Sequence, residues 1–339
     1  MEHEQHNQEV QERSRASGLK EYAVPIAIVI AGITFALSYY LVQTGAGSGA
    51  RFAVQNAPAG QFEEAVLPSK GVELPVTWGD LGKKLVDAGA IDASAMEGLY
   101  RNRGGMPAEY RTLLTGSSNE KLVMTQDNAG YLLNLLWALG LANKNPILED
   151  KTEMMNPNYG GAGNFASTGG WTIAKGDAMN HYNMHSLVTL TADQQKLVDK
   201  VSRGIFRPCC GNSTHFPDCN HGMAMLGLLE LMASQGVSEE EMYKVALAVN
   251  SYWFPDTYLT IAMYMQQKGV AWQDVSPKEV LGANYSGAAG FQNISSQVNT
   301  PSGGGGGGGC GVDTGAPAAA AAASEDHHPQ GQPQSGCGV

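Results

Sequence analysis

Apolar residues recur every three or four positions in residues 121–143, KLVMTQDNAGYLLNLLWALGLAN. This spacing gathers the apolar side chains on one face of a helix. The polar residues around Asp127 interrupt the pattern, so we expect two helices that break there. The stretch favours a helical fold, and the sequence on either side carries the start and stop signals of further short helices.

Capping residues and prolines mark these further helices. Ser, Thr and Asp accept hydrogen bonds from the first free N–H groups of a helix, and proline is tolerated in its first turn. The predicted helices follow Thr77, Asp92, Pro107, Asp177, Thr191, Cys219, Ser238 and Phe254. Because we find no alternating strand pattern of useful length, we predict an all-α domain of short helices over residues 76–292.

An uncharged apolar segment lies near the N-terminus, in residues 22–43, YAVPIAIVIAGITFALSYYLVQ. No charged residue occurs between Glu21 and Arg51. About 20 apolar residues cross the hydrocarbon core of a bilayer as a helix. We therefore predict a single transmembrane helix over 22–43, with the lipid bilayer as its partner. Cleavage after the small residues 45–50, GAGSGA, is the alternative, with the segment acting as a signal peptide.

The basic residues predict the orientation of this helix. Arg13, Arg15 and Lys20 precede the span, and only Arg51 follows it closely. Cytoplasmic flanks carry the excess of Lys and Arg. The rule makes residues 1–21 a cytoplasmic disordered tail and the main domain extracytoplasmic, at the cell membrane.

Charge and composition bound the rest of the chain. The 21 Lys and Arg residues against 32 Asp and Glu give a net charge of −11, which argues against nucleic acid as a partner. Residues 44–75 are predicted as a linker. Residues 293–339 are predicted as a disordered tail rich in Gly, Ala and Pro, through which a protein partner could bind. The sequence leaves the oligomeric state open.

The most informative segment is RPCCGNSTHFPDCNHGMAMLGLLELMASQG, residues 207–236. It contains Cys209, Cys210, Cys219, His215 and His221 within thirteen residues. A turn-rich loop leads into an apolar helix that begins near Cys219, so ligands from the loop and the helix can converge. Thiolate and imidazole ligands suit zinc or copper. We predict a metal site built from these five residues, with His215 as an alternative ligand.

Helix geometry restricts how these ligands combine. Residues two apart on a helix point in nearly opposite directions, so Cys219 and His221 meet one ion only if Cys219 lies in the helix cap. Met225 is four residues after His221 and shares its face, which makes its thioether a weaker candidate ligand.

Two other interpretations of the cysteines remain open. A disulfide from Cys219 to Cys209 or Cys210 would be purely structural. Alternatively, Cys219 at a helix N-terminus is a reactive thiolate, with His221 or His215 as its base and a neighbouring cysteine as the resolving thiol.

A weaker metal site is predicted at His181 and His185, which are four residues apart and would share one face of a helix. Tyr182 follows His181 where a zinc hydrolase of the HExxH type has its general base, so this pair does not predict hydrolysis.

The sequence therefore predicts a membrane-anchored extracytoplasmic protein that handles, senses or structurally uses copper or zinc. The alternatives are a thiol/disulfide-active enzyme using Cys219 and a non-catalytic surface interaction protein stapled by disulfides.

Overall fold

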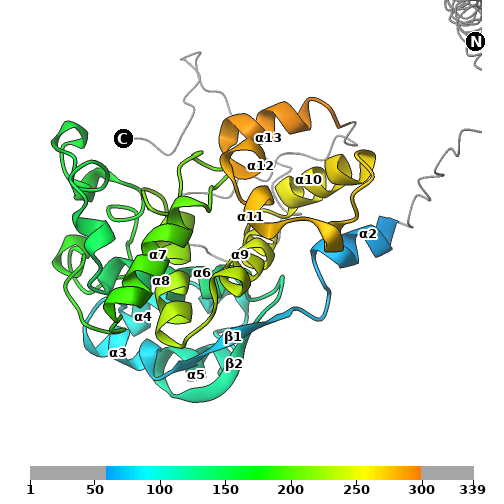
Figure 1. Ribbon diagram of the computed structural model, residues 1–339. Coiled ribbons are helices and arrows are strands. Elements are labelled where there is room, and N and C mark those ends of the chain that lie inside the picture. Colours follow the sequence, from blue (N-terminus) through cyan, green and yellow to red (C-terminus); the bar gives the residue numbers. More distant parts are fainter. Residues whose placement is uncertain (1–58, 299–339) are drawn as a thin grey trace, which may run out of the picture. The chain divides into compact units, whose positions relative to one another are not determined.

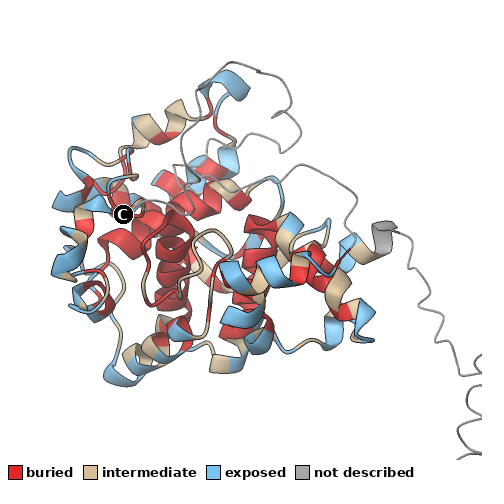
Figure 2. Ribbon diagram, turned by 90° about the horizontal axis from the view of Figure 1, so that it is seen from above, coloured by how far each residue is buried: buried red, intermediate tan, exposed pale blue. Residues whose placement is uncertain are grey.

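Two helices form the centre of the fold, α6 (Ala129–Ala142) and α8 (Asn220–Ser234). The structure, a computed structural model, describes residues 59–298. Almost every residue of both helices is buried, and Figure 2 shows the buried residues, in red, gathered on the inner helices of the described part. A helix that is apolar on all sides belongs in the interior of a protein.

The central helices touch backbone to backbone at two glycines. A Cβ atom at Gly140 would lie 2.0 Å from the carbonyl oxygen of Met223, and one at Gly227 would lie 2.4 Å from that of Leu136. No side chain fits in either place. The two glycines therefore fix how closely α8 packs on α6.

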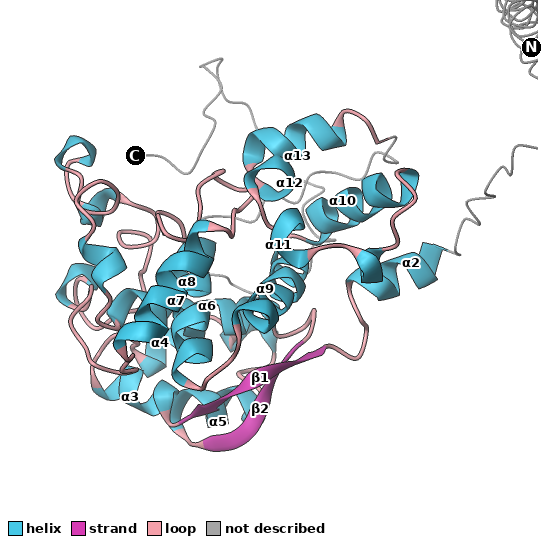
Figure 3. Cartoon of the chain, in the orientation of Figure 1, coloured by secondary structure: helices cyan, strands magenta, loops and turns pink. Residues whose placement is uncertain are grey.

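Further helices surround this pair (Figures 1 and 3). On the N-terminal side they are α2 (Ala59–Val66), α3 (Leu81–Asp87), α4 (Ala93–Gly98) and α5 (Ala108–Thr115). Later in the chain come α7 (Ala192–Arg203), α9 (Glu239–Trp253), α10 (Pro255–Gln267), α11 (Pro277–Val280), α12 (Ala283–Ser286) and α13 (Ala288–Ser295). Within residues 59–298, 3₁₀ turns lie between them at Arg101–Arg103, Pro146–Glu149, Pro157–Tyr159, Ala162–Asn164, Ala178–Asn180 and Trp272–Asp274.

The mostly helical architecture confirms the coarse prediction, but the described part also contains a two-stranded antiparallel sheet. Strand β1 (Val72–Gly79) pairs with β2 (Ser118–Met124) (Figure 3). The expectations of no strand and of a helix before Asp127 are therefore wrong. In β1 the buried side chains alternate, at Leu74, Val76 and Trp78.

The two strands differ in the signals that their sequences carry. Pro75 lies between two of the buried residues of β1 and resembles a strand breaker. β2 buries only Leu122 and Met124, too few for a clear period of two. The alternation of apolar residues is visible in β1 apart from Pro75, whereas in β2 it is too short to recognise.

The helix predicted directly after Thr77 begins later than expected. Thr77 is a strand residue, and β1 continues to Gly79. Asp80 is the N-cap of α3, which starts at Leu81, so a single residue separates the strand from the helix.

The other start signals are confirmed, with one exception. Asp92 accepts hydrogen bonds from the N–H groups of Ser94 and Ala95 at the start of α4, and Thr191 forms a capping box with Gln194 at the start of α7. The helices predicted after Pro107, Cys219, Ser238 and Phe254 are α5, α8, α9 and α10. Asp177 caps only the 3₁₀ turn Ala178–Asn180, so the short helix predicted through Leu187 is not formed.

The folded part is longer than predicted at both ends. Helix α2 and the start of β1 fall within residues 44–75, which we predicted as a linker, and α13 continues past residue 292 to Ser295. The predicted segments 1–21 and 22–43, and the tail after residue 298, lie outside the described residues. Among the helices of residues 59–298, none has both the length and the apolar character needed to cross a bilayer.

Candidate metal centre

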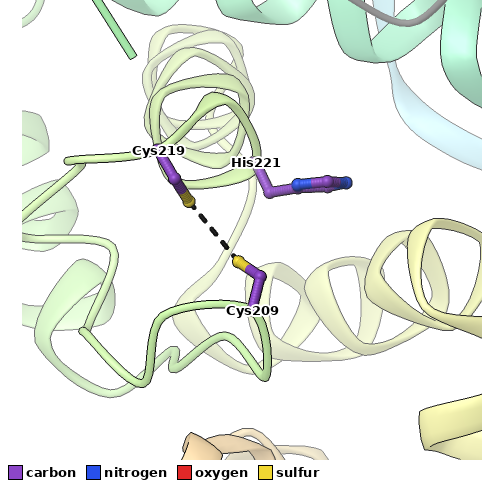
Figure 4. A group of neighbouring side chains, drawn as sticks. All are labelled: Cys209, Cys219 and His221. Atoms are coloured by element: carbon purple, nitrogen blue, oxygen red, sulfur yellow. Dashed lines mark hydrogen bonds between the residues drawn. The ribbon is translucent and has the colours of Figure 1, made fainter. Parts of the chain in front are cut away.

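The segment between α7 and α8 folds back on itself and carries two cysteines toward a third. Phe206 and Ser213 form an antiparallel bridge, and Gly211 makes the turn between them with a positive φ of 75°. Cys219 is the N-cap of α8, with an extended backbone (φ −121°, ψ 167°). Figure 4 shows Cys209 on the loop facing Cys219 at the first turn of the helix.

The three sulfur atoms form a nearly equilateral triangle. The Sγ atom of Cys219 lies 3.5 Å from that of Cys209 and 3.6 Å from that of Cys210, and the sulfurs of the two neighbouring cysteines are 3.8 Å apart. All three residues are free thiols. Cys219 is fully buried, whereas Cys209 and Cys210 are half-buried.

A buried ion pair lies beside this sulfur triangle. The Nη2 atom of Arg207 is 2.6 Å from Oδ1 of Asp218 and 3.2 Å from Sγ of Cys210. Arg207 also donates to the carbonyl oxygens of Ser213 and Phe216, so it holds the loop closed. Taking two charges out of water is costly, and the pair is tolerated because several hydrogen bonds compensate the guanidinium.

The first turn of α8 is shaped to receive Arg207. A Cβ atom at Gly222 would lie 2.6 Å from Cζ of Arg207 and 2.7 Å from its Nη1. The guanidinium therefore rests directly on the helix backbone at Gly222. Any larger residue there would push Arg207 away from Asp218 and the sulfurs.

The surroundings favour a negative charge on Cys219. Hydrogen bonds from the thiols of Cys209 and Cys210 hold the pKa of Cys219 well below its ordinary value, and the positive charge of Arg207 acts in the same direction. Free N–H groups at the start of a helix also stabilise an anion there. The contacts with Cys210 and Cys219 raise the pKa of Cys209. Burial raises the pKa of Asp218 to about 6, although Arg207 opposes this shift.

His221 lies on the first turn of α8, beside Cys219 (Figure 4). It offers one ring nitrogen within a group in which the ligand atoms of Cys209, Cys219 and His221 all lie within 4.8 Å of one another. Its ring packs on Phe254, with centroids 4.3 Å apart, and meets Trp253 edge to face. The requirement that Cys219 occupy the cap is met, but the ring of His221 points away from the two sulfurs in Figure 4, so an ion shared by both residues requires the ring to turn.

The structure places His215 with carboxylates instead of with the sulfurs. Its Nδ1 is 2.5 Å from Oε2 of Glu153, and its Nε2 is 2.8 Å from Oδ1 of Asp199 on α7. It lines a cavity of about 310 Å³ together with Asp150 and Asp199. Burial alone would lower the pKa of His215, but the hydrogen bond and negative charge of Glu153 outweigh it and raise the pKa.

The structure pairs two of the weaker candidate ligands, His181 and His185, and buries the third, Met225, in the hydrophobic core. His181 and His185 do meet, with Nδ1 and Nε2 3.2 Å apart, although no helix carries them. The other nitrogen of His181 lies 3.0 Å from the carbonyl oxygen of Lys175, so one ring position is already used. Met225 is fully buried in the hydrophobic core, one turn after His221.

Comparison of the chain with protein-family models, with curated proteins and with solved structures gives no match. The site is therefore interpreted from its own chemistry. That chemistry combines three converging sulfur ligands with a neighbouring imidazole, which together resemble the donor set of a soft-metal site.

Arg207 and Asp218 were missed by the sequence reasoning, although both lie inside the segment that it singled out. A lone Arg and a lone Asp in a polar loop normally indicate solvated surface groups. The available signal was their position: Arg207 begins the turn-rich loop, Asp218 ends it next to Cys219, and Gly222 leaves room for the guanidinium.

Proposed function

We propose that this chain is a membrane-anchored, extracytoplasmic protein that binds zinc or copper. Cys209, Cys210 and Cys219 supply the sulfur ligands, and His221 supplies a nitrogen ligand. The bound ion serves metal handling, sensing or stabilisation of the loop. The single observation that carries the proposal is the triangle of sulfur atoms.

The size of this triangle agrees with metal coordination. A zinc ion about 2.3 Å from each of its sulfur ligands, in tetrahedral geometry, places those sulfurs about 3.8 Å apart. The three distances here are 3.5, 3.6 and 3.8 Å. An ion can therefore bind all three sulfurs with little movement of the chain.

Charge supports a cation at the same place. Three thiolates close together repel one another, and Arg207 is already paired with Asp218, so the pair adds no net charge. A bound cation would compensate the thiolates in this poorly hydrated site. His221 as a fourth ligand would complete the Cys₃His set that zinc accepts, whereas copper(I) favours the sulfurs.

The membrane anchor and the outward orientation rest on the sequence alone. They are supported by the uncharged segment 22–43 and by the excess of Lys and Arg before it. Protease protection of the chain in sealed membrane vesicles tests both, because an extracytoplasmic domain is cut from that side only.

Elemental analysis tests the metal site. The full chain would be purified in detergent under reducing, metal-replete conditions, with Cys310 and Cys337 of the tail replaced by Ser so that only the three clustered thiols remain. We expect one zinc or copper ion per chain, and loss of that ion in Cys219→Ser.

A matched control is His185→Gln, which removes a metal-binding side chain outside the sulfur triangle and should keep the ion. If the reduced chain holds no stoichiometric metal, the proposal is wrong. If metal survives Cys219→Ser but is lost in His185→Gln, the site has been assigned to the wrong residues.

A further inference from the structure

We infer that the three-thiol site releases its metal by exchange with a small disulfide. In this reaction Cys209 or Cys210 reacts first, and Cys219 then closes an internal disulfide. The inference rests on the proposed metal site and adds an activity to it, in which oxidation of two ligands is coupled to discharge of the ion.

The arrangement of the sulfurs makes Cys219 the common partner. Its Sγ atom contacts the sulfurs of both other cysteines, at 3.5 and 3.6 Å. A bridge between Cys209 and Cys210 would instead join neighbouring residues, which strains the planar trans peptide bond between them. The internal disulfide therefore includes Cys219 and one of the two loop cysteines.

Exposure sets the order of the steps. Cys209 and Cys210 are half-buried on the loop, so a small disulfide can reach them from solvent. Cys219 is fully buried at the N-cap of α8 and is shielded from that reagent. The loop cysteine consequently makes the first attack, and Cys219 acts as the resolving thiol from inside the protein.

The electrons and atoms of the exchange balance without any other reagent. The loop sulfur, which is a thiolate while it binds the ion, attacks one sulfur of the small disulfide, forms a mixed disulfide and expels one small thiolate. The Cys219 thiolate then attacks the loop sulfur, breaks the mixed disulfide and expels the second small thiolate. Two cysteine sulfurs are oxidised, the two sulfurs of the reagent are reduced, and each expelled thiolate takes up a proton from water.

The loss of two sulfur ligands explains the release of metal. A sulfur in a disulfide is no longer a thiolate and no longer binds the ion tightly. One thiol and His221 remain, which is too few ligands for a closed site. Disulfides persist outside the cytoplasm, in the compartment proposed for this domain.

Glutathione disulfide is the probe for this reaction. The metal-loaded full chain carrying Cys310→Ser and Cys337→Ser is mixed with it, and the released metal, the released glutathione thiol and the protein mass are followed. We expect one ion and two glutathione thiols per chain, with an internal disulfide that includes Cys219.

Three single variants of this chain locate the steps. Cys219→Ser, tested without metal, should keep glutathione attached as a mixed disulfide, with one glutathione retained for each glutathione thiol released, whereas the parent chain retains none. Cys209→Ser and Cys210→Ser are the matched controls, because each leaves Cys219 one partner and should still release two thiols. The inference is overturned if the parent chain ends with glutathione attached, if the bridge joins Cys209 to Cys210, or if excess reagent leaves all three thiols unreacted.

The same measurement on the metal-free chain separates this inference from the proposed function. If the chain forms the Cys219 bridge but never binds metal, the proposed function fails and the exchange reaction stands. If the chain binds metal but forms no such bridge, the metal site stands and the exchange reaction is refuted.

Discussion

Replacing Glu230 by Gln should remove much of the dependence of this protein's stability on pH. Glu230 is fully buried on α8, and its carboxyl group accepts hydrogen bonds from Asn143, at 3.1 Å, and from Asn145, at 2.5 Å. Burial raises the pKa of this carboxyl from 4.5 to about 8, against the effect of the two amides. The folded protein therefore keeps a proton on Glu230 at neutral pH.

The sign of the effect follows from proton binding in the two states. Between about pH 4.5 and pH 8 the folded chain holds this proton and the unfolded chain has lost it. Stability then falls as pH rises, because the folded state binds more protons than the unfolded state. Each pH unit changes the free energy by about 1.4 kcal/mol, so the loss between about pH 4.5 and pH 7 amounts to roughly 3 kcal/mol.

A glutamine in place of Glu230 has no proton to lose, so the variant should escape this decline. We expect the difference in unfolding free energy between E230Q and the parent chain to grow by roughly 3 kcal/mol in favour of the variant over that range. Urea unfolding of both chains at a series of pH values, in the same metal-free buffer, measures it. Other titrating groups cancel in the difference.

The hydrogen bonds of Glu230 affect the size of the difference but leave its slope unchanged. The amide of E230Q offers one oxygen to Asn143 and Asn145 where the carboxyl offers two, and this cost is the same at every pH. A difference that stays constant over the range, or that moves against the variant, would refute the assignment of a protonated buried carboxyl.

Three further predictions concern the residues around the candidate metal centre. Gly222→Ala should lower the free energy of unfolding in urea by about 1–3 kcal/mol and weaken metal binding, because the new Cβ overlaps Arg207. Gly98→Ala is the control, because its Cβ would meet no atom closer than 3.7 Å. Equal effects at both positions would contradict the reasoning. Arg207→Met should destabilise the protein by roughly 3–5 kcal/mol, because it leaves Asp218 buried without its partner. Adding Asp218→Asn should restore part of that loss. A double variant no more stable to urea than the single variant would count against the ion pair. His215→Gln should destabilise the protein most below about pH 6.5, and less as the pH rises through the raised pKa of His215. The reason is that the carboxylates of Glu153 and Asp199 stabilise the folded state only while the His215 ring is charged. The same loss in urea unfolding on both sides of this range would be inconsistent with that pairing.

The helices were predictable where local chemistry specifies them. Asp92, Thr191 and Ser238 satisfy free N–H groups in the first turn after them, and that interaction involves residues close together in the sequence. The sheet was not predictable in this way. Helices α3, α4 and α5 separate β1 from β2 along the chain, and β2 buries only two side chains. The alternating residues of β1 therefore have no partner strand with a recognisable pattern.

In the candidate site, too, contacts between residues close in sequence were predictable and contacts between distant residues were not. The clustering of Cys209, Cys210 and Cys219 in sequence predicted their convergence, because a short turn-rich loop keeps them near the start of α8. His215 belongs to the same segment, but the backbone after Ser213 turns it toward Glu153, which lies 62 residues earlier in the chain. No local pattern could reveal a partner at that distance.

The contact of α6 with α8 through Gly140 and Gly227 bears on the ion selectivity of the proposed metal site. Backbone against backbone leaves α8 no room to slide, so Cys219 and His221 occupy fixed positions, while Cys209 and Cys210 belong to a loop that turns at Gly211. In the proposed metal site, ions of different radius would then have to be accommodated by the loop alone. The range over which the loop can adjust would therefore limit which ionic radii fit.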